Sequence, residues 1–163
     1  MENENKKKTA NDVGGILGKI QMKDASDYLV VNITDCVNGS IKMQSNSLCV
    51  GIMAWLGPEK RIENAEVNID RCRNYCLDMT SEGGANDVVG IYGNRGNGGA
   101  NTRAATTITN CFTLYRSKFP MNNAGDNSDC AIMRPYGGSR EENIHLDPAQ
   151  PNLYMDKSSF AVS

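Results

Sequence analysis

The sequence predicts an all-β protein of the β-solenoid type, similar to a parallel β-helix, and three observations lead to this prediction. Gly and Asn are abundant, with 16 and 19 residues in a chain of 163, and both favour turns and left-handed backbone conformations. No segment keeps apolar residues at helical spacing over three turns. Two short sequence blocks also recur along the chain, which is typical of a repeat fold.

The two blocks define three repeats and a degraded fourth. The first block reads VGGILG, CVGIMA or VVGIYG, and its anchors are Gly15, Gly51 and Gly90. The second block reads NITDC, NIDRC or TITNC, and its anchors are Cys36, Cys72 and Cys111. In each repeat the Cys follows the Gly by 21 residues, which indicates structural repeats of 36 to 39 residues. Residues 130–133 and 152–156 take the two block roles in the degraded fourth repeat.

Apolar residues alternate with polar ones just before each anchor cysteine, which predicts half-buried strands. The alternating positions are Val31 and Ile33, Val67 and Ile69, and Thr106 and Ile108. We expect Ile33, Ile69 and Ile108 to point inward as a ladder, because equivalent residues of stacked coils align along the axis.

The anchor glycines are expected where the backbone turns a corner or packs too closely for a side chain. Because two blocks alternate at nearly half the period, we expect about two coils per repeat of 36–39 residues. Residues 12–163 then form a single β-solenoid domain, and residues 1–11 form a flexible N-terminal segment or linker.

The blocks resemble the GLUG-motif repeats of large bacterial secreted and surface proteins. The likeness is clearest at residues 13–18, at 108–112 and at the closing segment 152–156, and it extends from about residue 12 to 160. Ala54 and Arg71 depart from the family pattern, and the fourth repeat lacks its Gly pair. The resemblance implies a β-solenoid on a surface protein and implies no catalytic chemistry by itself.

Six cysteines in an exported chain raise the question of disulfides. With two coils per repeat, Cys36, Cys72 and Cys111 lie about 9 to 10 Å apart, beyond the reach of a disulfide, and we interpret them as buried apolar side chains. A pair among Cys49, Cys76 and Cys130 stays open.

Charge and hydropathy exclude several partner classes. The net charge of −2 gives no field that attracts nucleic acid, and no apolar run is long enough to embed the chain in a membrane. The N-terminus has no apolar signal-peptide region. Either the protein is cytoplasmic, or the chain is part of a larger secreted or surface protein, as the repeats favour.

We expect no catalysis within these residues, and neither cofactor nor metal. His145 is the single histidine, and Cys72 and Cys76 are the one closely spaced cysteine pair. The residue before each anchor cysteine is Asp35, Arg71 or Asn110. These three residues form either a charged patch or an ordinary solvated face. Paired carboxylates would be needed for a carbohydrate-cleaving β-helix, the enzymatic alternative.

Two segments of the sequence are candidate binding loops. Residues 54–61 contain Trp55, and residues 92–103 contain Tyr92 and Arg95 at the equivalent place. Either an aromatic face beside a guanidinium holds a ligand, or these aromatic residues cover the edge of a coil. The candidate partners are neighbouring domains of the same chain, a glycan, or a host or cell-surface protein.

The sequence therefore favours a non-catalytic β-solenoid repeat module that serves as spacer, scaffold or adhesive segment of a larger bacterial surface or secreted protein. The alternative is a carbohydrate-active β-helix enzyme or a glycan-binding accessory domain attached to one.

Overall fold

The computed structural model describes residues 12–22, 28–58, 65–76, 78–81, 87–93, 105–114, 132–133, 144–145, 149 and 152–154. All regular structure in these residues is β-strand, which confirms the predicted all-β class. The expected N-terminal linker, residues 1–11, lies outside the described residues.

The strands fall into repeats that follow the same order along the chain. Repeat 1 contains β1 (Asp12–Gly14), β2 (Leu17–Met22), β3 (Leu29–Thr34), β4 (Val37–Asn38) and β5 (Lys42–Ser45). Repeat 2 contains β6 (Leu48–Val50), β7 (Met53–Pro58), β8 (Ala65–Asp70), β9 (Arg73–Asn74) and β10 (Asp78–Ser81). Repeat 3 contains β11 (Asp87–Val89), β12 (Ala105–Thr109) and β13 (Phe112–Thr113), and repeat 4 contains β14 (Ile144–His145) and β15 (Leu153–Tyr154).

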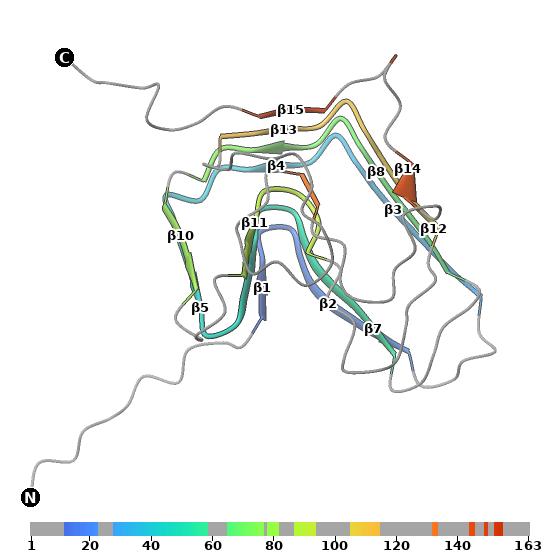
Figure 1. Ribbon diagram of the computed structural model, residues 1–163, viewed down its shortest axis with the longest axis horizontal. Coiled ribbons are helices and arrows are strands. Elements are labelled where there is room, and N and C mark those ends of the chain that lie inside the picture. The colour runs from blue at the N-terminus through green and yellow to red at the C-terminus, as the bar shows by residue number, and fades with distance from the viewer. Residues whose placement is uncertain are drawn as a thin grey trace, which may run out of the picture.

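Every strand pairs in parallel with its counterpart in a neighbouring repeat. The sheets have the orders β1-β6-β11, β2-β7, β14-β12-β8-β3, β15-β13-β9-β4 and β10-β5. In Figure 1, β3, β8 and β12 run side by side and turn into β4, β9 and β13 at a shared corner. Each repeat therefore adds one strand to each sheet in which its strands take part.

The register shows that the expectation of two coils per repeat is wrong. Ile33 pairs with Ile69, and Ile69 pairs with Ile108, so residues one repeat apart are direct neighbours in adjacent strands. All three side chains are buried, with exposed fractions of 7%, 0% and 0%. One repeat is thus one strand spacing, about 4.8 Å, and not two.

The same register corrects the expected separation of the anchor cysteines. Cys36 and Cys72 lie between the register pairs Thr34–Asp70 and Val37–Arg73, and so face each other one strand spacing apart. Cys111 follows Cys72 in the same way. Their backbones are within disulfide range, although all three cysteines are free in this structure.

The chain folds back on itself within each repeat, so that β1 and β2, and likewise β6 and β7, form an arch inside the angle of the other strands (Figure 1). At the top of the arch, a Cβ on Gly15 would lie 2.3 Å from the side-chain nitrogen of Asn38, and a Cβ on Gly51 2.3 Å from that of Asn74. The anchor glycines therefore sit where the backbone packs against a buried amide and leaves no room for a side chain.

Three apolar clusters fill the spaces around the arch. The largest contains Ile33, Ile69 and Ile108 together with Ile52 and Tyr92. A second cluster consists of Met43, Cys49, Cys76, Met79 and Val88. Leu48, Val50, Ala54 and Val89 form the third. The parallel sheets are thus held by a continuous core that runs from repeat to repeat.

Candidate functional site

The corner between β3/β8/β12 and β4/β9/β13 carries the polar residues that the sequence singles out. Asp35, Arg71 and Asn110 occupy this corner with φ angles of 55°, 51° and 52°, in the left-handed region. Asp and Asn tolerate this conformation well, whereas an arginine there is uncommon. The corner geometry is thus the same in three repeats, although the side chains differ.

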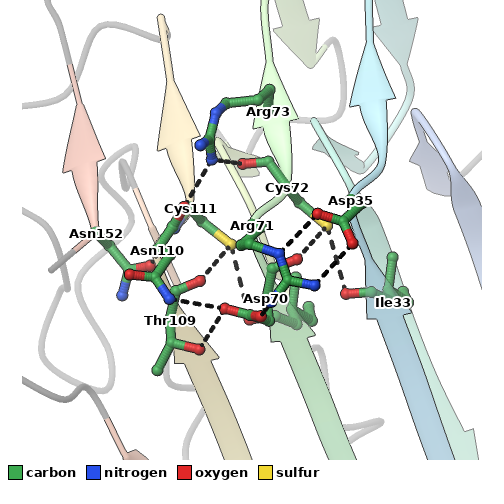
Figure 2. Close-up of polar contacts among 11 residues, drawn as sticks. Ile33, Asp35, Asp70, Arg71, Cys72, Arg73, Thr109, Asn110, Cys111 and Asn152 are labelled. Atoms are coloured by element: carbon green, nitrogen blue, oxygen red, sulfur yellow. Dashed lines mark hydrogen bonds and ion pairs between the residues drawn. The ribbon is translucent and has the colours of Figure 1, made fainter. Parts of the chain in front are cut away.

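Arg71 joins the carboxylates of two neighbouring repeats. Its Nε donates to Oδ1 of Asp35 over 2.7 Å, and its Nη2 donates to Oδ2 of the same carboxylate over 2.7 Å. Nη1 of Arg71 bonds to Oδ2 of Asp70. This two-point contact with Asp35 matches the planar fork of the guanidinium (Figure 2).

Asp70 extends the network to repeat 3. Its Oδ1 accepts hydrogen bonds from the Thr109 hydroxyl at 2.9 Å and from the Asn110 side-chain amide at 3.0 Å. The hydrogen bond from Asn110 is the main cause that lowers the pKa of Asp70, and the hydrogen bond from Arg71 lowers the pKa of Asp35. Both carboxylates are therefore ionised near neutral pH.

This arrangement suits an inter-repeat clamp better than acid–base catalysis. A glycosidase needs one carboxylic acid that stays protonated to donate a proton to the leaving group. Asp35 and Asp70 are both bound to Arg71 and have lowered pKa values. The charged patch that the sequence suggested is thus a row of side chains that bond to one another at an exposed corner.

An open pocket of about 530 Å³ lies beside this corner on the outer face of β9, β13 and β15. It is lined by Arg73, Tyr75, Asn110, Cys111, Phe112 and Leu153. The Tyr75 and Phe112 rings lie 5.8 Å apart and tilted by 51°, and Tyr75 is 43% exposed. The pocket thus presents aromatic surface to solvent.

Arg73 supplies the charge of the pocket. Its Nη1 donates to the Asn110 carbonyl at 2.6 Å and to the Cys72 carbonyl at 3.2 Å, which fixes one corner of the guanidinium against the backbone (Figure 2). Guanidinium groups carry five N–H donors, so donors remain for a ligand oxygen. The pocket therefore brings together a positive charge, two aromatic rings and the backbone carbonyls of the corner.

Of the binding residues proposed from the sequence, the structure describes the environment of Tyr92 and the backbone of Trp55. Tyr92 is fully buried in the main core, so the expectation that it offers an exposed aromatic face is wrong, and burial raises its pKa. Trp55 lies within strand β7, not in a loop, with Lys19 as its register partner. Arg95 lies outside the described residues.

The structure places three of the remaining sequence candidates, Cys49, Cys76 and His145. Cys49 and Cys76 are both buried in the second cluster, and both are free. Cys130 lies outside the described residues, and His145 lies in β14 opposite Thr107. Among the described residues, no group of three or more His, Cys, Asp or Glu side chains could hold a metal ion.

Sequence reasoning missed the pocket, although a signal for it exists. Val37, Arg73, Phe112 and Leu153 are register partners and occupy the outward position just after the anchor position in each repeat. An apolar or aromatic residue at three of these four outward positions is unusual for a solvated face. Comparing the residue after each anchor would have indicated this surface.

No family model matches the chain, and no curated protein or solved structure matches it either. The described residues contain no helix that is long and apolar enough to cross a membrane.

Proposed function

We propose that this chain is a β-solenoid module that acts as spacer, scaffold or adhesive segment of a larger bacterial secreted or surface protein, as its likeness to GLUG-motif repeats implies. The observation that carries the proposal is the register. Asn32 pairs with Asn68, and Asn68 pairs with Thr107, in parallel strands, so that equivalent residues lie on the same face of the sheet. Repeated parallel pairing of this kind is how a solenoid extends along its axis.

The exposure of equivalent residues supports a role within a longer stack. Ile16 is 42% exposed, whereas its counterparts Ile52, Ile91 and Ile132 in later repeats are each 0% exposed. An apolar side chain that is exposed in the first repeat, while its counterparts in later repeats are buried, favours contact with neighbouring parts of the same protein.

The location of the module is testable on intact cells. We expect an antibody raised against the purified chain to label unbroken bacteria, and externally added protease to remove that label. An antibody against a cytoplasmic protein of the same cells is the control. Labelling that appears only after lysis would contradict a surface or secreted role.

Glycan binding is the second candidate function, and the pocket beside the corner favours it. Tyr75 and Phe112 offer ring faces on which a sugar can stack, and Arg73 offers donors for hydroxyl or carboxylate oxygens. A single open site of this size predicts weak binding, which an adhesive segment would strengthen by multivalency.

A glycan array tests this candidate with a matched pair of variants. We expect Tyr75→Ala to reduce any glycan signal about twofold to tenfold, because a stacking ring contact is worth about 0.5 to 1.5 kcal/mol. Tyr28→Ala is the control, since Tyr28 is 65% exposed but bonds to Glu66 outside the pocket. Equal loss in both variants would exclude the pocket, and measurable polysaccharide cleavage by the wild-type chain would overturn the non-catalytic proposal.

A further inference from the structure

The three anchor thiols form a continuous row across repeats 1 to 3. The backbone holds the row on both sides of the first pair, because the Asp35 amide donates to the Asp70 carbonyl at 3.1 Å and the Arg73 amide donates to the Cys36 carbonyl at 2.8 Å. Register partners in a parallel sheet have Cα atoms about 4.8 Å apart, which lies within the disulfide range of about 4.4 to 6.8 Å.

The thiols also lean toward the preceding repeat. Sγ of Cys72 donates to the carbonyl of Ile33 at 3.4 Å, and Sγ of Cys111 donates to the carbonyl of Ile69 at 3.7 Å (Figure 2). Sγ of Cys72 is also 3.4 Å from the carbonyl of Asp70 in its own repeat, so this thiol lies between repeats 1 and 2, with Cys36 opposite it in the register.

The chemical environments of the three thiols differ. Cys36 is half-buried and lies at the repeat 1 end of the row, whereas Cys72 and Cys111 are 0% and 1% exposed. Burial raises the pKa of Cys36, and a hydrogen bond from the Cys111 thiol lowers the pKa of Cys72. An oxidant can thus reach Cys36 first, and Cys72 lies behind it in the row.

We propose that Cys36 and Cys72 are a redox-responsive pair, which a small disulfide such as oxidised glutathione converts into a covalent bridge between repeats 1 and 2. The Cys36 thiolate attacks one sulfur of glutathione disulfide and releases one glutathione thiolate. The Cys72 thiolate then attacks Sγ of Cys36 and releases the second. The protein loses two protons and two electrons, and the glutathione disulfide is reduced to two thiols.

The bridge is expected to be reversible. Register partners have Cα atoms about 4.8 Å apart, closer than the roughly 5.5 to 6 Å most common in disulfides, so closing the bond requires side-chain rotation and leaves the bridge strained. Disulfides formed against the local geometry are more easily reduced. A bridge here would fasten the exposed first repeat to the second under oxidising conditions and release it under reducing ones.

Peptide mapping of the full chain tests the proposal. The reduced protein is incubated with oxidised glutathione, alkylated and digested. We expect one bridge, between Cys36 and Cys72, with a mass lower by two hydrogens than the reduced peptides, and its loss on adding dithiothreitol. A persistent glutathione adduct on Cys36, a bridge elsewhere, or no reaction would each overturn the proposal.

Two variants separate the steps. Cys72→Ser removes the resolving thiol, so we expect a stable glutathione adduct to accumulate on Cys36. Cys49→Ser is the control, because Cys49 lies in the second cluster, and this variant should form the Cys36–Cys72 bridge as the wild type does. The mapping of the wild-type chain decides the question even if a variant folds poorly. None of these outcomes depends on where the protein functions.

Discussion

The side-chain amide of Asn38 donates a hydrogen bond to Oδ1 of Asn74 over 2.9 Å, one repeat further along the chain. Asn74 donates in turn to the Thr113 hydroxyl at 3.0 Å, and its Oδ1 also accepts from the Cys76 backbone amide at 3.2 Å. Asn38 donates further to the Gly51 carbonyl at 2.9 Å. A row of buried amides therefore links the arch to the outer sheet across three repeats.

Removing the central member of this row should be costly. Asn74 is 0% exposed, and Asn74→Ala removes one buried hydrogen bond each from Asn38, Thr113 and the Cys76 amide. We expect a loss of about 2 to 4 kcal/mol in the free energy of unfolding, measured by urea denaturation. Asn68→Ala is the matched control, since Asn68 bonds to Asn32 on the exposed face. Equal losses in the two variants would contradict the buried row.

The glycines facing these amides give a second prediction. A Cβ on Gly51 would lie 2.1 Å from the Gly90 carbonyl oxygen, and neither backbone can move away without disturbing its sheet. We expect Gly51→Ala to lower stability by about 3 kcal/mol or more, the upper part of the range for overpacking. Gly39→Ala should change stability by less than about 0.5 kcal/mol, because nothing lies within 4 Å of its Cβ position. A tolerated Gly51→Ala would mean that the arch does not pack against Asn74.

Acidification should weaken the corner network. The pKa of Asp70 in the folded state lies below the ordinary value of 3.8 for an aspartate, chiefly because Asn110 donates to the ionised carboxylate. A lowered folded pKa contributes stability that is present above pH 3.8 and is lost as the pH falls through the folded pKa. Urea denaturation between about pH 6 and pH 2.5 should show a shallower decline for Asp70→Asn than for the wild type. Parallel curves would show that Asp70 does not contribute.

Local patterns in the sequence were enough to predict the strands that precede the anchor cysteines. The alternation of Val31 and Ile33 predicts a strand with one buried face, and β3 has alternating burial over Leu29–Thr34. The distance between equivalent residues also equals the pairing offset, since Ile69 lies opposite both Ile33 and Ile108. The alternation is a property of a short segment and can be recognised without knowing the tertiary contacts, whereas the pairing offset became known only from the register.

The number of coils per repeat depended on a contact that the sequence does not reveal. The first block folds into an arch that packs inside the same turn as the second block, with Gly15 against Asn38. Spacing alone cannot distinguish that arrangement from two stacked turns. The buried state of Tyr92, in contrast, had a signal, because its equivalents Leu17 and Met53 are both apolar.

Tyr92 and Tyr75 differ in burial, so truncating them should lower stability by different amounts. Tyr92 is fully buried in the main core, so Tyr92→Ala creates a large cavity, and we expect a loss of about 3 to 5 kcal/mol in the free energy of unfolding. Tyr75 is 43% exposed in the pocket, and Tyr75→Ala should cost less than about 1 kcal/mol. Thermal denaturation followed by circular dichroism measures both.

In the glycan-binding assay, we expect Tyr75→Ala to have the larger effect of the two variants. Tyr75→Ala should weaken any glycan signal while the protein stays folded, whereas Tyr92→Ala should affect binding only in proportion to the fraction that unfolds. Tyr92→Phe separates the ring from its hydroxyl, because it keeps the volume that fills the core and should retain most of the stability. If Tyr92→Ala were stable and specifically deficient in binding, Tyr92 would contact ligand, and the assignment of binding to the pocket at Tyr75 and Phe112 would be wrong.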